Sequence, residues 1–183
     1  HGSISASIGR DQRSLELWRH GIYAAVTADR IANVHEQFRH PAGFTVALLH
    51  DIGLIPLILY ARRNNLDLSW NINEDDTEEE SKLLGYSRAE VGAMLLEHWN
   101  FPKEMVDAVR FHVLGEGGPW PLTELVRIAS YCACAVTIVD PETLNAYLRR
   151  VSVSISCEEL SSIIPLVSAE GNQIITEIES CCF

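Results

Sequence analysis

The stretch Leu48-Leu49-His50-Asp51-Ile52-Gly53 decides how this sequence folds. It places an imidazole and a carboxylate inside the longest apolar run of the chain, from Phe44 to Tyr60. Burying an ionised carboxylate is costly unless a cation or hydrogen-bond donors compensate its charge. Asp51 is therefore expected to have a specific partner, either a metal ion or a neighbouring imidazole or backbone donor.

The apolar run itself predicts a helix over residues 44–62 that is apolar on nearly every face. Such a helix must be surrounded by neighbours, so it is expected to be the central helix of the fold. The run is interrupted by His50, Asp51, Gly53 and Pro56, and it is shorter than the roughly 20 residues that cross a bilayer. The sequence therefore predicts a buried core helix and no membrane partner.

Further helices follow on both sides, because apolar residues recur there at three- and four-residue steps. Ser87 and Ser156 each have Glu three positions later, a capping-box pattern, and Asp140-Pro141 favours a helix start. The expected helices cover about residues 12–33, 87–99, 105–112, 122–139, 140–150 and 156–179. The fold class is all-α, a compact multi-helix bundle. We expect one domain over residues 1–183, with its core at about 12–139 and C-terminal helices at about 140–183.

One segment departs from this helical pattern. Residues 64–80 are polar and end in a dense run of carboxylates, Glu74 to Glu80. Charge of one sign at this density favours a solvated loop. We expect a solvated connector here, and rank a cation-binding role well behind it.

Charge and cysteine content restrict the partners and the compartment. The formal net charge is −11, which opposes a nucleic-acid partner because such binding depends on clustered Lys and Arg. The five cysteines are odd in number and lie mostly in helix-like sequence, as buried reduced thiols do. A cytoplasmic location is expected.

Two further histidines lie where they would reach the His50-Asp51 pair. His20 is on the first expected helix, and His112 is at the end of a later one. A site of imidazoles and one carboxylate suits Mn, Fe or Zn better than Mg or Ca. The candidate metal ligands are thus His20, His50, Asp51 and His112. The alternative, ranked higher, is a hydrogen-bonded buried pair of His50 and Asp51 that anchors the helices without an ion.

The spacing of several blocks resembles that of HDOD domains, the HD-related output domains, over about residues 15–135. The blocks are Leu17-Trp18-Arg19-His20, Ala47 to Gly53, Glu90 to Leu96 with Trp99-Asn100-Phe101-Pro102, Ala108 to His112, and Arg127-Ile128-Ala129. HDOD domains are relatives of the HD and HD-GYP phosphohydrolases, so the resemblance implies a bundle of the HD type. The family usually carries a further N-terminal helical lobe, so this chain could be the C-terminal lobe of a larger domain.

The resemblance also implies which metal ligands have been replaced. The HD site uses a His on the first helix, a His-Asp pair and a later Asp, and that Asp falls at Ser130 here. A further His of the HD-GYP enzymes falls near Arg88, whose positive charge would repel a cation. Their paired His-His is here His112 followed by Val113. HDOD domains share this erosion and are regarded as regulatory modules in bacterial signalling.

Three functions are left open by the sequence. The first is a non-catalytic regulatory module, without a cofactor, that acts through protein partners or fused signalling domains. A homo-oligomer is one form that such a module could take. The second is a metal-dependent phosphohydrolase acting on a nucleotide or a cyclic dinucleotide. The third is a nucleotide sensor without turnover. We expect the first, with no residue assigned to catalysis.

Overall fold

The helices α2 (Gln12–Val34) and α8 (Leu122–Ala135) lie against each other and form the centre of the protein. A computed structural model describes residues 12–66, 77–113, 118, 120–149 and 154–182. The other elements, in chain order, are the short 3-10 helix η1 (Glu36–Phe38) and the helices α3 (Gly43–Leu49), α4 (Leu54–Arg63), α5 (Thr77–Leu84), α6 (Arg88–His98), α7 (Lys103–Phe111), α9 (Pro141–Leu148) and α10 (Cys157–Cys182). The described residues contain no strand, so the predicted all-α bundle is confirmed.

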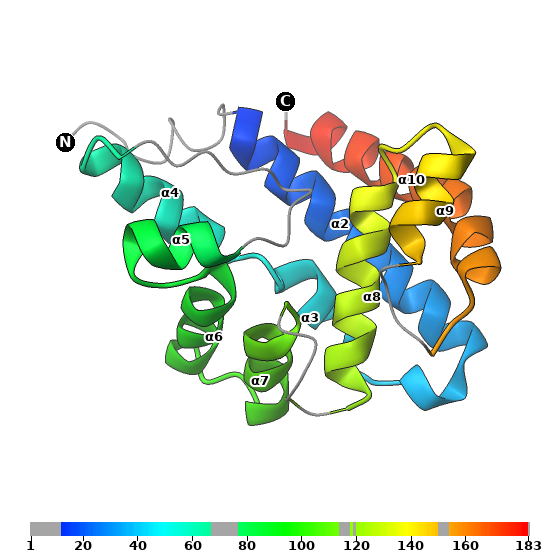
Figure 1. Ribbon diagram of the computed structural model, residues 1–183, viewed down its shortest axis with the longest axis horizontal. Helices are drawn as coiled ribbons and strands as arrows, with labels where there is room; N and C mark the ends of the chain where they lie inside the picture. The colour runs from blue at the N-terminus through cyan, green and yellow to red at the C-terminus, as the bar shows by residue number, and fades with distance from the viewer. Residues whose placement is uncertain (1–11, 67–76, 114–117, 119, 150–153, 183) are drawn as a thin grey trace.

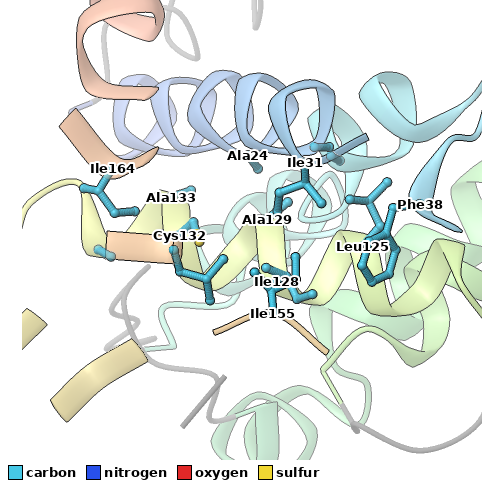
Figure 2. Close-up of a cluster of buried hydrophobic side chains, with 14 of the residues drawn as sticks. Ala24, Ile31, Phe38, Leu125, Ile128, Ala129, Cys132, Ala133, Ile155 and Ile164 are labelled. Atoms are coloured by element: carbon cyan, nitrogen blue, oxygen red, sulfur yellow. The ribbon is translucent and has the colours of Figure 1, made fainter. Parts of the chain in front are cut away.

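The core lies on both sides of α8. On one side, Leu125, Ile128, Ala129 and Cys132 pack against α2 and against the C-terminal helices α9 and α10 (Figure 2). On the other side, Leu122 and Val126 pack against α3, α6 and α7 in a second apolar cluster. Most of α8 is therefore buried, and its partly exposed residues are Glu124, Arg127 and Tyr131.

The prediction that residues 44–62 form the central helix is wrong. These residues form two helices, α3 and α4, separated by a tight turn at residues 50–53. In the turn, the amide of Ile52 donates to the carbonyl of Leu49 at 3.0 Å, and the amide of Leu54 donates to that of Asp51 at 2.9 Å. One face of each helix is exposed, for example Phe44 and Tyr60, whereas α8 takes the central position.

Gly53 explains why the chain turns at this point. A Cβ atom on Gly53 would lie 2.0 Å from the carbonyl oxygen of Arg88 and 2.5 Å from the amide nitrogen of Gly92. Only glycine therefore lets the turn approach the first turns of α6 this closely. The contact places Asp51 beside the N-terminus of α6.

By length and composition, residues 43–63 would be enough to cross a membrane. In the structure this segment is divided by the turn at residues 50–53, and half of its most apolar window is buried inside the bundle. It is accordingly part of the protein core, as is usual for apolar segments of globular proteins.

The predicted connector over residues 64–80 is only partly correct. Residues 67–76 lie outside the described part of the chain. Thr77 to Glu80 belong to the first turn of α5, and Glu80 is 2% exposed. A carboxylate in an acidic run is thus buried, because it meets an arginine from α6.

The helix starts and ends agree with the local sequence. Ser87 and Glu90 form the predicted capping box, with Glu90 accepting from the Ser87 amide at 2.8 Å. Asp140 caps α9, with Pro141 as its first residue. Helix α8 ends at Ala135, four residues before the predicted end at Val139, and α10 is one helix that contains Pro165.

Candidate metal centre

His20 comes to the centre of the site because α2 and α3 approach each other closely at Gly21. A Cβ atom on Gly21 would lie 2.8 Å from the carbonyl oxygen of Leu48. The neighbouring side chain, His20, is 4% exposed, and its Nε2 lies 3.1 Å from Nε2 of His50. The first helix is thereby joined to the turn that follows α3.

His50 is fixed by a bond to its own helix. Its Nδ1 lies 2.7 Å from the carbonyl oxygen of Ala47. A carbonyl only accepts hydrogen bonds, so Nδ1 carries a proton and donates. Nε2 therefore faces His20, and the short contact between the two Nε2 atoms holds one proton.

His112 approaches from the opposite side, at the C-terminal end of α7. Its Nδ1 donates to the carbonyl of Val109 at 2.7 Å, which leaves Nε2 directed at the cluster. That Nε2 lies 3.9 Å from Oδ1 of Asp51, and the ring is edge-on to His50 with 5.1 Å between centroids. Two helices, α2 and α7, and the turn at residues 50–53 thus supply the three imidazoles and the carboxylate.

Asp51 lies in the middle of this cluster and is 5% exposed. Its Oδ2 is 3.5 Å from Nε2 of His50 and 3.8 Å from Nε2 of His20. The same oxygen is 3.6 Å from Nη1 of Arg88. All four predicted site residues are therefore brought together, and a protein cation joins them.

The ion pair of Arg88 with Glu80 was not predicted from the sequence. Oε1 of Glu80 accepts from Nε of Arg88 at 2.6 Å and lies 2.6 Å from Nη2, while Oε2 accepts from the Arg88 backbone amide at 2.7 Å. Two features of the sequence pointed to this pair: Arg88 is the first residue of a capped helix, and Glu80 lies eight residues before it. Neither signal showed that both side chains are buried.

Burial controls the protonation of the cluster. Removal from water, together with the neighbouring His50, lowers the pKa of His20 from 6.5 to about 3 and that of His112 from 6.5 to about 4. Burial also acts to raise the pKa of Asp51, but attraction by His50, Arg88 and the other imidazoles outweighs it and lowers that pKa. At neutral pH, His20 and His112 are uncharged and Asp51 is ionised.

The donor atoms are close enough to share an ion, but the charge beside them opposes one. One donor atom each from His20, His50 and Asp51 lie within 4.8 Å of one another. Imidazole and carboxylate donors suit Mn, Fe or Zn. The guanidinium of Arg88, however, is fixed 3.6 Å from the only carboxylate among the predicted ligands. The residues as arranged do not fit a divalent cation.

The other positions of the expected site carry no ligand. Ser130 is buried on α8 and offers a hydroxyl in place of a carboxylate. Val113 lines a separate cavity of about 550 Å³ formed by α5, α6 and α7. Asp51 itself lines a smaller cavity of about 220 Å³, whose walls include Leu17, Trp18 and Leu48.

Comparisons with known proteins agree with the fold. A model of the HDOD domain matches residues 3–114, the greater part of the chain. A crystal structure of a protein named "Putative phosphohydrolase", from Shewanella amazonensis SB2B, is similar with a TM-score of 0.59 and 20% identity. The similarity covers 92% of this chain and 69% of that one, and at this identity it shows the fold alone. No curated protein matches the chain.

Proposed function

This chain belongs to the HDOD family, and from that premise we propose that it is a non-catalytic regulatory module of bacterial signal transduction. It acts in the cytoplasm through protein partners or fused signalling domains. One observation carries the proposal: the counter-cation of the buried Asp51 is Arg88, a group of the protein itself. A carboxylate that is compensated in this way needs no ion to stay buried.

A guanidinium cannot replace a metal in hydrolysis. A catalytic metal lowers the pKa of a bound water and orients the resulting hydroxide toward phosphorus. Arg88 has only donor hydrogens and no open coordination position, and it remains protonated at physiological pH. The cluster therefore supports the helices, and Arg88 cannot activate water as a metal would.

Exposed apolar side chains on α3 and α4 support an action through partners. Phe44 and Leu48 on α3, and Leu59 and Tyr60 on α4, are between 36% and 54% exposed. Exposed apolar side chains such as these are available for contact with a partner. A protein partner or a second copy of the chain is the occupant that this chemistry fits.

The catalytic question is tested by a matched assay. The purified chain is incubated with Mn²⁺, Fe²⁺ or Zn²⁺ and with bis(p-nitrophenyl) phosphate, nucleotides or a cyclic dinucleotide. We expect no turnover above that of Asp51→Asn, which lacks the only carboxylate of the cluster's predicted ligands. Turnover by the wild type that this variant abolishes would refute the proposal. Tight nucleotide binding without turnover would favour the sensor function instead.

The partner surface is tested in cells in which deletion of the gene has a measurable effect. The double variant Leu59→Glu/Tyr60→Glu is expected to fail to complement the deletion, because it puts two charges on the exposed face of α4. Asp51→Asn is the control and should complement. Circular dichroism and thermal unfolding show whether both variants are folded. The opposite pattern, with only Asp51→Asn inactive, would indicate that the cluster performs the function.

A metal-dependent phosphohydrolase is the second candidate. The close approach of donor atoms from His20, His50 and Asp51 favours it, with His112 as a further donor. The turnover assay above separates it from the regulatory module.

A further inference from the structure

Glu80 and Arg88 form a buried pair that controls the charge next to the imidazole cluster. We propose that Glu80 positions the guanidinium of Arg88 as a built-in cation, and that His20, His50 and Asp51 are a closed divalent-metal site that opens once this pair is neutralised. The inference deepens the proposed non-catalytic function and rests on it. It assigns a role to two residues that do not themselves belong to the ligand set.

The geometry shows that Glu80 fixes the guanidinium. Both oxygens of Glu80 are used, one on Nε and Nη2 of Arg88 and the other on its backbone amide, all at 2.6 or 2.7 Å. Glu80 is 2% exposed and Arg88 is 5% exposed. Charge-assisted bonds of this length in a buried environment leave a side chain little freedom. Nη1 is thereby held toward Asp51.

The backbone of Arg88 is fixed as well. Its carbonyl oxygen lies against Gly53, in the turn that carries Asp51, so closely that no other residue fits there. Its amide is bound by Glu80 of α5, and Ser87 caps the helix that it starts. The guanidinium and Asp51 thus belong to elements that pack directly against each other.

The charges of the cluster explain why the pair excludes a metal. The three groups comprise two carboxylates, Asp51 and Glu80, and one guanidinium, Arg88. Replacing Arg88 alone would leave two buried carboxylates without this cation, which is strongly destabilising. Neutralising both Glu80 and Arg88 leaves Asp51 as the only charge of the three. The imidazoles of His20 and His50 then face an unshielded carboxylate, and the three groups together are a donor set for Co²⁺, Mn²⁺ or Zn²⁺.

The test uses the double variant Glu80→Gln/Arg88→Met, which removes both charges. Gln has the size of Glu, and Met keeps the unbranched stem of Arg without its guanidinium. Affinity for Co²⁺ is measured by calorimetry and by the visible absorption bands of the bound ion, in the full chain. We expect one ion per chain, bound at least about 100-fold more tightly than by the wild type, because a fixed positive charge near the site has gone. The ion should also raise the melting temperature of the variant but not that of the wild type.

Three matched variants locate the effect. Arg88→Lys keeps the positive charge and should bind Co²⁺ as weakly as the wild type. Adding Asp51→Asn or His20→Asn to the double variant should remove most of the gained affinity, since each takes away one donor. A double variant that folds only with Co²⁺ also supports the proposal, because the ion then replaces the lost cation.

Several results would overturn the proposal. One is a folded double variant that binds Co²⁺ no better than the wild type, and another is a double variant that Co²⁺ does not rescue from unfolding. Tight binding by the wild type would show that Arg88 does not exclude the ion. These outcomes differ from failure of the proposed function, which requires turnover of a phosphate ester by the wild type.

Discussion

At the scale of single residues, the cluster around Asp51 is a case of buried charge compensated by the protein. The imidazoles contribute no cation at His20 or His112, because burial keeps both uncharged at neutral pH. A positive charge comes from Arg88, which was expected to repel a metal ion. Arg88 also serves as a partner for Asp51. The two effects have the same cause, a guanidinium held in a water-poor environment.

The low pKa values of the histidines predict sensitivity to acid. In the unfolded chain His112 has its ordinary pKa of 6.5, but in the folded chain its pKa is about 4. Between these values the unfolded state binds a proton that the folded state does not, so stability falls as pH falls. The same holds for His20 down to about pH 3. Each proton lowers the free energy of unfolding by roughly 1.4 kcal/mol per pH unit.

Urea unfolding between pH 7 and pH 4.5 measures this slope. His112→Asn keeps a donor for the carbonyl of Val109 and cannot titrate, so it should reduce the slope by about one proton. Asp51 contributes to the slope of stability against pH only below its ordinary pKa of 3.8, because its neighbours lower its pKa in the folded chain. An unchanged slope in His112→Asn would mean that His112 is not held neutral in the folded protein.

At the scale of elements, close helix contacts position the cluster. Gly21 allows α2 to meet α3, and Gly53 allows the turn to meet α6. Periodicity located most helices correctly, because apolar spacing reflects the buried face of each one. It failed at residues 50–53, because the break there depends on the approach of a second helix, which no local pattern records.

Gly53→Ala is therefore expected to be strongly destabilising. Its Cβ would meet backbone atoms of Arg88 and Gly92, so α6 must shift, at a cost of roughly 1–3 kcal/mol or more. Gly92→Ala is the matched control, because its nearest neighbour is a movable methyl group of Val109 at 3.1 Å. Urea unfolding of both variants measures the difference. Equal stability of the two would show that the turn is not tightly packed.

At the scale of the whole molecule, α8 organises the bundle, with apolar clusters on both of its sides. The exposed apolar faces of α3 and α4 lie outside these clusters. Hydrophobicity alone assigned the central position to residues 44–62, since their sequence is as apolar as that of α8. Which of these two apolar segments is surrounded depends on how the other helices pack.

Paired leucine substitutions test this arrangement. Leu125→Ala on α8 removes a fully buried side chain and should lower the free energy of unfolding by about 2–5 kcal/mol. Leu59→Ala on α4 removes a side chain that is 37% exposed, so its cost should be clearly smaller. Thermal and urea unfolding of both variants give the comparison. A larger loss in Leu59→Ala would place the centre of the core in α4 instead.

The sequence by itself determined the all-α class, the helix caps and the identity of the three histidines that gather around Asp51. These follow from local spacing, from capping chemistry and from the rule that a buried charge needs a partner. Only the tertiary structure decided that Arg88 joins the imidazoles as a partner of Asp51, that Glu80 is buried with it, and that α8 is central. The physical reason is that burial and charge pairing between distant elements depend on their three-dimensional packing, which local spacing does not specify.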